Sequence, residues 1–480
     1  MQKSLSFHTF FYLVSFVIMR GSGIIAKIFL ARTITPYEYG LITLLVIALP
    51  GLFQLITNFC FFDILGHSTE GKKYFSFSLI YGSIATAIIA TFFILFPQQI
   101  FQFLNIEWES WPFWTIILIG SLYSVTIAGF IVGILRGGRD HSLAASFSAA
   151  PSILRVIFII IAIYIFNITN FYVIMFLFAL PPIIILIPVL LYKRETIRDS
   201  FRSILIPNRN MLMFGFSFFI INAWVSLSQH INSVVISHDL GLEWQGYFDV
   251  SLSVVAVMLF FSGAFYLVSV PETTRNSNNK EILTKSGGLG DIGRLLLSMC
   301  LLCVLIIYFY SHQLVIFLFS SDYSIAGDYL IILAIGYTIL FIQQYCAFLS
   351  IPSDNEGISK LTTLTILSIA AFPFFTSVMI HKFEFMGAYL ATAVLITVYT
   401  LFSLILIKDH TPIKLLFVKF ERLALSFGLT WLVLYFFPLP LFIGLISSTV
   451  LFCILIVVFS YIDINLIKNL VQINDVNPKN

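Results

Sequence analysis

Long apolar segments, separated by short polar joints, repeat along the whole chain. A helix that crosses a bilayer needs about 20 predominantly apolar residues. By that measure the pattern predicts about fourteen spanning helices, at 7–32, 39–62, 74–96, 112–135, 142–166, 170–192, 210–236, 246–270, 294–319, 327–350, 358–380, 385–407, 415–436 and 439–462. The joints leave no room for a folded soluble domain, so we predict an all-α integral membrane protein.

Composition supports this interpretation. Of 480 residues, 59% are apolar and 10% are charged, whereas soluble domains have about 45–50% and about 25%. A soluble chain with so few charges would have a largely apolar surface, which excludes a soluble enzyme, a nucleic-acid-binding protein and a disordered protein. The lipid bilayer is therefore the first predicted partner. We find no catalytic motif, and Cys300 and Cys303, which have a Cys-x-x-Cys spacing, lie inside an apolar segment without a second pair of ligands. We therefore expect no catalytic residue, metal or cofactor.

The basic residues predict an orientation. Cytoplasmic joints of membrane proteins carry an excess of Lys and Arg. With the N-terminus placed inside, 21 of the 26 basic residues fall in inner joints or at the helix ends beside them, and only Arg32 and Lys382 fall on the outer side. One missed or invented helix in the first half would destroy this bias. We therefore predict a multi-pass protein of the cytoplasmic membrane with both termini in the cytoplasm.

The predicted helices divide into two similar sets of six. We expect an N-terminal lobe at 1–195, a cytoplasmic linker at 196–209, a second lobe at 210–408, and two extra helices with a cytoplasmic tail at 409–480. A shift of 206 residues places Gly40 on Gly246, each after a short outer joint. Both lobes start inside, which makes a parallel repeat, and transporters built this way bind substrate between the halves.

Three basic residues lie inside predicted helices. Arg20 and Lys27 are seven residues apart on one face of 7–32, and Arg155 is near the middle of 142–166. A cation at bilayer depth costs at least roughly 2.5–3.5 kcal/mol on insertion scales, and no acidic residue lies at that depth in the first six segments. Snorkelling and pairing with backbone carbonyls are the structural alternatives. The functional interpretation is a cationic cavity for an anionic substrate, because guanidinium groups bind phosphate through paired hydrogen bonds.

Polar side chains form a stripe along the segment 210–236. A polar stripe on a membrane helix faces protein or water rather than lipid, so it lines a cavity or bonds a neighbouring helix. We take it as a candidate sugar-binding wall, together with two residues of 39–62. The candidate residues are Asn222, Ser226, Gln229, His230, Ser233, Gln54 and Asn58. Gln343 and Gln344 in 327–350 are interpreted in the same way.

Asp249 is the acidic residue best separated from the joints, near the outer end of 246–270. An ionisable residue at such a position can couple transport to protons or sodium. The structural alternative is an interfacial carboxylate in contact with water. Asp249 is therefore our ion-coupling candidate.

The exit of the first segment carries a recognisable pattern. Residues 20–45 read RGSGIIAKIFLARTITPYEYGLITLL, with Leu30-Ala31-Arg32, then Pro36, then Glu38-Tyr39-Gly40 opening the next helix, and GILRGGRDH at 133–141 forms a basic inner loop. This resembles the polysaccharide and oligosaccharide flippases of the multidrug/oligosaccharidyl-lipid/polysaccharide exporter superfamily. The resemblance implies a two-lobed transporter of a polyprenyl-linked oligosaccharide diphosphate. It also implies a groove for the lipid tail at the last two helices.

We therefore predict a flippase that moves a lipid-linked oligosaccharide across the cytoplasmic membrane for cell-surface polysaccharide assembly, by alternating access. Coupling to H+, Na+ or the membrane potential is left open, and glycan polymerase or transferase subunits are further candidate partners. One alternative is a multidrug or cation antiporter of the same superfamily, which would be expected to carry buried acidic residues. The other is a non-transport membrane subunit of a glycan-assembly complex.

Overall fold

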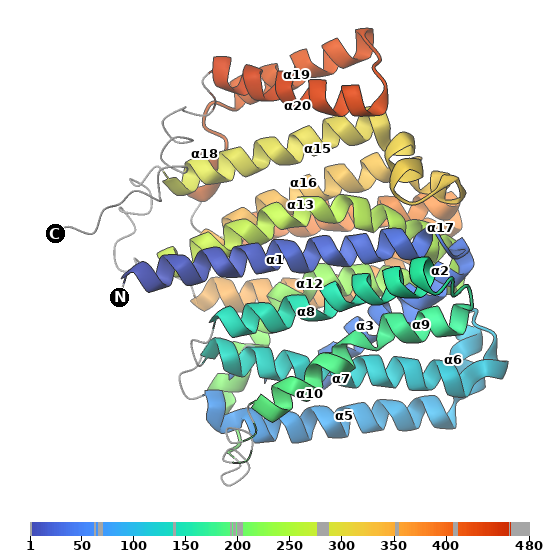
Figure 1. Cartoon of the computed structure of the whole chain (residues 1–480). Coiled ribbons are helices and arrows are strands. Elements are labelled where there is room, and N and C mark those ends of the chain that lie inside the picture. Colours follow the sequence, from blue (N-terminus) through green and yellow to red (C-terminus); the bar gives the residue numbers. More distant parts are fainter. Residues whose placement is uncertain are drawn as a thin grey trace. The chain divides into compact units, whose positions relative to one another are not determined.

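A computed structural model gives the fold of the chain (Figure 1). It describes residues 2–61, 64–65, 71–137, 141–192, 194, 198, 205–275, 288–350, 355–406, 411–459 and 461. Helices make up the secondary structure of these ranges, and no strand occurs in them. The all-α fold class is confirmed.

The first half of the chain contains helices of very different length. In chain order they are α1 (Gln2–Ala31), α2 (Pro36–Thr43), the π-helical turn η1 (Leu44–Ala48), α3 (Leu49–Thr57), η2 (Gly71–Tyr74), α5 (Phe75–Leu95), α6 (Pro97–Phe103), η3 (Trp108–Ser110), α7 (Trp111–Gly137), α8 (His141–Ile160), the π-helical turn η4 (Ile161–Ile165), α9 (Phe171–Ala179) and α10 (Pro181–Tyr192).

The second half contains several of the longest helices. They are α12 (Arg209–Asp239), α13 (Leu242–Arg275), α15 (Gly288–Leu318), η5 (Ser321–Gly327), α16 (Leu330–Ser350), α17 (Asn355–Leu406), α18 (Thr411–Leu416), α19 (Phe420–Phe436) and α20 (Leu441–Val458). Helix α17 is two helices joined at a kink, where Glu384 has φ 52° and ψ −136°.

Ten helices in the described ranges are long and apolar enough to cross a membrane, and a bent pair within α12 brings the number to eleven. One of the ten covers Ser359–Leu406, which is 48 residues and long enough for the two crossings that the sequence predicts there. Each of the fourteen predicted segments overlaps at least one helix of the described residues. The chain is a multi-pass membrane protein.

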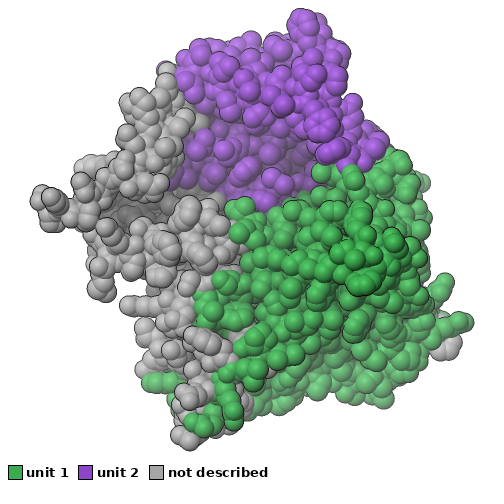
Figure 2. All heavy atoms as spheres, viewed as in Figure 1, with its two compact units in different colours: residues 1–253, 318–326, 361–392 green, residues 254–317, 327–360, 393–480 purple. Residues whose placement is uncertain are grey.

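The chain forms two compact units (Figure 2). Unit 1 comprises 1–253, 318–326 and 361–392, and unit 2 comprises 254–317, 327–360 and 393–480. These units do not follow the predicted boundary at 196–209, since unit 1 continues to Ser253. The division into two six-helix lobes stays a prediction. Inner and outer ends of helices are named below by the predicted orientation.

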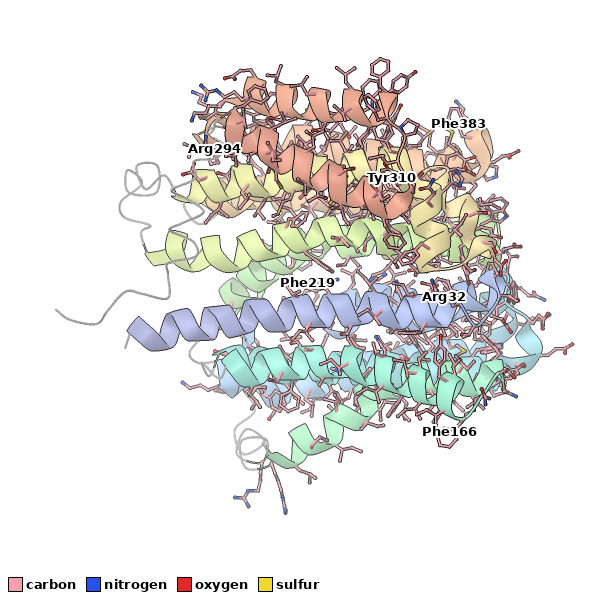
Figure 3. The ribbon with its side chains drawn as sticks, turned by 45° about the horizontal axis from the view of Figure 1, so that its top comes forward. Arg32, Phe166, Phe219, Arg294, Tyr310 and Phe383 are labelled. Carbon is pink, nitrogen blue, oxygen red and sulfur yellow. The ribbon has the colours of Figure 1, made fainter. Side chains whose placement is uncertain are left out.

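In unit 1, α1 lies alongside α8 (Figure 1). Figure 3 shows Arg32 at the outer end of α1, where its Nε donates to the Leu318 carbonyl oxygen at 2.9 Å. The outer end of α12 is held by the joint after α6. There the Asn105 amide nitrogen donates to the carbonyls of Ser237 at 2.7 Å and His238 at 2.8 Å. These carbonyls belong to the last turn of the helix, which has no intrahelical donors for them.

In unit 2, α19 and α20 form an antiparallel pair (Figure 1). A Cβ atom added to Gly444 of α20 would overlap the ring of Tyr310 from α15, so glycine permits this close approach. At the inner end of α15, Arg294 forms an ion pair with Asp291. The Arg294 guanidinium carbon lies 6.0 Å from the centre of the Tyr461 ring. This unit contains Gln343, which is buried, and Gln344, which is partly buried.

Candidate functional site

Lys27 of α1 forms an ion pair with Asp249 of α13 inside unit 1. The Lys27 Nζ donates to Asp249 Oδ1 at 2.9 Å and Oδ2 at 2.8 Å, and to Ser253 Oγ at 3.3 Å. The side chains of Lys27 and Asp249 are 18% and 9% exposed. An ammonium group has three N–H donors, so these partners account for all of them. The sequence suggested no acidic partner for Lys27 because Asp249 lies 222 residues away in a later segment.

Asp249 has a second partner, which is the hydroxyl of Tyr39. This hydroxyl donates to Asp249 Oδ2 at 2.7 Å, and Tyr39 is completely buried. The Tyr39 ring packs edge-on against Tyr323, with 5.7 Å between the ring centres. Sequence reasoning used Tyr39 only as part of a family pattern and missed this contact.

The start of α2 fixes the position of Tyr39. Thr35 caps the helix, since its Oγ1 accepts from the Glu38 backbone N–H at 3.3 Å while Glu38 Oε2 accepts from the Thr35 backbone N–H at 2.9 Å. Pro36 follows as the first helical residue, where its missing N–H costs nothing. The segment Thr35-Pro36-Tyr37-Glu38 therefore determines where α2 begins, and Tyr39 follows directly.

Gly40 of α2 and Gly246 of α13 face each other. A Cβ atom added to Gly40 would overlap the Leu242 carbonyl, and one added to Gly246 would overlap the Pro36 carbonyl. The two contacts are reciprocal, because Leu242 precedes Gly246 by four residues and Pro36 precedes Gly40 by four. We call the meeting of 36–40 with 242–246 the outer contact.

The predicted polar stripe of α12 is only partly buried in protein. Ser233 is buried and donates to the Gln229 carbonyl at 3.1 Å, whereas Ser226 is exposed. His230 packs on α3, where a Cβ atom on Gly51 would overlap its ring. His230 also lies within electrostatic reach of Lys27 and Asp249. The side chain of Asn222 lies outside the described residues.

A stronger polar contact of α12 was missed. Asn232 is completely buried; its amide nitrogen donates to Thr392 Oγ1 at 2.6 Å and its amide oxygen accepts from Thr376 Oγ1 at 2.8 Å. Asn232 thus bonds two stretches of α17 on either side of the kink. The only signal in the sequence was a polar residue in an apolar helix, and this cannot identify partners 144 and 160 residues away.

Arg155 of α8 is bonded to α9 of the same unit. Its Nε donates to the Phe178 carbonyl at 3.0 Å, and its guanidinium carbon lies 4.9 Å from the centre of the Phe178 ring. Pairing with a backbone carbonyl was the structural alternative for this residue. One N–H of a guanidinium is used in this bond, and the group has five. Arg155 therefore retains capacity for further acceptors.

Arg20 is exposed on α1, the helix that lies alongside α8. It lies 11 residues before the end of α1 at Ala31, and Arg155 lies 10 residues before the end of η4 at Ile165. At 1.5 Å per residue both are about 16 Å from the outer ends of their helices. The two arginines therefore lie at similar distances from the outer ends of two neighbouring helices, and Lys27 lies about 10 Å nearer the outer end of α1 than Arg20.

The candidate residues in and directly after α3, Gln54 and Asn58, lie apart from these groups. Asn58 is buried, its amide oxygen has no hydrogen-bond partner among the described residues, and its amide nitrogen faces Gly129 of α7. Gln54 is partly buried. Beside Asn58, the hydroxyls of Thr57 and Thr126 bond at 2.8 Å.

The structure brings Lys27 and Asp249 together, with His230 within electrostatic reach of both, and places Arg20 and Arg155 on adjoining helices. Their roles in substrate binding stay predictions. No group of three or more His, Cys, Asp or Glu side chains that could hold a metal ion occurs within the described ranges.

The fold is that of the lipid II flippase and multidrug exporter structures. The chain matches the lipid II flippase MurJ in an inward closed conformation with a TM-score of 0.67 and 15% identity, over 96% of this chain and 99% of that one. A point mutant of the MATE transporter VcmN of Vibrio cholerae matches with a TM-score of 0.56 and 16% identity, over 85% and 96%. A MOP superfamily transporter from Pyrococcus furiosus matches with a TM-score of 0.56 and 15% identity, over 86% of this chain and 95% of that one.

The sequence itself matches a family model. Residues 8–276 match the model of the polysaccharide biosynthesis proteins, and the chain belongs to this family. No curated protein sequence matches it. The resemblance in residues 20–45 and 133–141 is confirmed, since both segments lie within the matched range.

Proposed function

We propose that the protein flips a polyprenyl-diphosphate-linked oligosaccharide from the inner to the outer leaflet of the cytoplasmic membrane, for assembly of a cell-surface polysaccharide. Membership of the polysaccharide biosynthesis family and the flippase fold support transport rather than catalysis. The observation that carries the choice of substrate is the set of three basic residues at bilayer depth. A polyprenyl-linked glycan carries its negative charge at the diphosphate, next to the membrane.

Arg20 is the residue we propose as the main ligand of the diphosphate. It lies on α1 about as far from the outer end of its helix as Arg155 lies from that of α8 and η4, so we propose that two guanidinium groups bind one anion from adjoining helices. Arg155 keeps donors beyond its bond to Phe178. Lys27 lies further out along the same helix. The sugars need only hydroxyl and amide partners, which Gln229 of α12 and Gln54 of α3 offer.

A multidrug or cation antiporter is the alternative that the exporter structures keep open. Such a protein needs a carboxylate that can meet a cationic substrate. Asp249 already accepts hydrogen bonds from Lys27 and Tyr39, so its negative charge is paired with Lys27 and is not open to a cationic substrate. Asp249 remains our candidate for coupling to H+ or Na+, and it can serve only when Lys27 leaves it.

Deletion of the gene tests the proposal. We expect a lipid-linked glycan to accumulate on the inner leaflet, and its mass spectrum would identify both the sugar and the polyprenyl carrier. The intact gene should remove the accumulated lipid, while the Arg20→Ala variant, expressed to the same level, should not. Normal glycan export after deletion, combined with increased sensitivity to cationic drugs, would support the antiporter instead.

A further inference from the structure

We propose that the Lys27–Asp249 pair is a latch on the outer contact, and that the diphosphate of the substrate releases it by taking Lys27 from Asp249. This inference rests on the function proposed above and deepens it. It assigns a role to Tyr39 and Asp249, which are positioning residues in it and do not touch the substrate.

Competition for one ammonium group is the first step. The three N–H donors of Lys27 are occupied by Asp249 and Ser253. A diphosphate presents more negative charge and more acceptor oxygens than one carboxylate, so it can replace both partners. Arg20 lies seven residues before Lys27 on α1, which is about 10 Å nearer the cytoplasm. A head group held at Arg20 therefore reaches Lys27 next on its way out.

Loss of Lys27 leaves Asp249 in an unfavourable state. The Asp249 side chain is only 9% exposed, and a buried charge that loses its partner strongly destabilises the arrangement around it. The hydrogen bond from Tyr39 alone does not balance the charge. Water that enters from the outer side can solvate the Asp249 carboxylate, and this entry requires α2 and α13 to separate.

The neighbouring residues connect the ion pair to the outer contact. Tyr39, which bonds Asp249, directly precedes Gly40, whose Cα lies against the Leu242 carbonyl. Gln245 lies one turn from Asp249 on α13 and is completely buried, and neither of its amide atoms has a hydrogen-bond partner among the described residues. A buried amide without partners favours any state in which water reaches it. The outer contact therefore stays closed only while the Lys27–Asp249 ion pair is intact.

A cysteine at position 245 reports the opening. Gln245→Cys is introduced after the five native cysteines are replaced by alanine, and this background must retain transport. The protein is placed in nanodiscs and labelled with a bulky maleimide. We expect slow labelling without ligand, and at least about a fivefold faster rate with geranyl diphosphate, a soluble prenyl diphosphate. Geraniol, which has the same prenyl chain and no charge, should leave the rate unchanged.

Variants separate a latch from a purely structural ion pair. Asp249→Asn and Lys27→Gln should each label rapidly without ligand and lose the response to geranyl diphosphate. Tyr39→Phe, which keeps the ring and removes the hydroxyl, should label at an intermediate rate. Exchange of the charges, Lys27→Asp with Asp249→Lys, should restore slow labelling. The matched controls Lys382→Gln and Glu109→Gln alter exposed charges elsewhere in unit 1 and should behave as the parent.

The outcomes distinguish this inference from the proposed function. If geranyl diphosphate raises the melting temperature of the parent but leaves the labelling rate at position 245 unchanged, the latch is wrong and the flippase proposal stands. Slow labelling of Asp249→Asn would also overturn the latch. If geranyl diphosphate neither binds nor changes labelling, and gene deletion causes no accumulation of lipid-linked glycan, both proposals fail.

Discussion

Gly40 and Gly246 lie against each other, each with its Cα facing the carbonyl of the residue four positions before the other. The same two glycines coincide when the sequence is shifted by 206 residues. Reciprocity of this kind is what a twofold relation between two helices produces, because residue i of one then meets residue j of the other and the reverse. Two helices that cross closely at a pair of glycines also make such contacts, so the internal repeat stays a prediction.

Substitution of either glycine by alanine should open or destabilise the outer contact. The added Cβ would overlap a backbone carbonyl, which cannot rotate away, and overpacking of this kind costs about 1–3 kcal/mol. We expect Gly40→Ala and Gly246→Ala to lower the melting temperature of the purified protein by several degrees. Gly23→Ala is the matched control, since a Cβ there has nothing within 4 Å. An equal fall in the melting temperature of Gly23→Ala would show that the effect is not specific to the outer contact.

Arg20 tests the choice of an anionic substrate. Arg20→Lys keeps the charge and loses the paired donors of the guanidinium, so we expect reduced glycan export. Arg20→Ala should reduce export more, while the protein still inserts at the normal level. Export is measured as the cell-surface polysaccharide restored to a deletion strain. Normal export by Arg20→Ala would remove this residue from the proposal, which would then depend on Arg155.

Asn232 should matter for stability rather than for substrate binding. Replacement by leucine removes two buried hydrogen bonds and leaves Thr376 without an acceptor, which costs about 1–3 kcal/mol for that group alone. We expect Asn232→Leu to lower the melting temperature and to leave any diphosphate affinity of the remaining folded protein unchanged. Met213→Ala, an exposed change on the same helix, is the control. A selective loss of ligand binding with normal stability would instead place Asn232 in the substrate site.

The predicted orientation can be tested at one position in the long inner joint. Ser277 lies outside the described residues, in the predicted cytoplasmic joint 271–293. A cysteine introduced there should resist an impermeant thiol reagent in intact cells and react after the membrane is permeabilised. Lys382→Cys, in a predicted outer joint, should react in intact cells. Labelling of position 277 in intact cells would contradict the predicted orientation.

Some features were available from the sequence because they depend on local composition. About 20 apolar residues in a row can only be a helix in lipid, since backbone groups there must bond within the segment. The predicted segments consequently overlap helices of the described residues. The predicted segment began at 39, whereas α2 begins at Pro36, because Thr35 and Glu38, three positions apart, form a local cap. The three basic residues stood out for the same reason, as charges inside apolar segments.

Which side chains meet was decided only by the tertiary structure. Lys27 was expected to lack an acidic partner, and its partner Asp249 comes from a helix 222 residues later. Other contacts likewise join segments that are distant in the chain. They are the hydrogen bonds of Tyr39 with Asp249 and of Asn232 with Thr392, and the packing of Gly40 on Gly246. Apolar periodicity cannot specify these pairs, because a membrane helix is apolar on most faces and many rotations bury it equally well. Close backbone approach and a few charged or amide groups select one rotation, and these act only once the helices are packed.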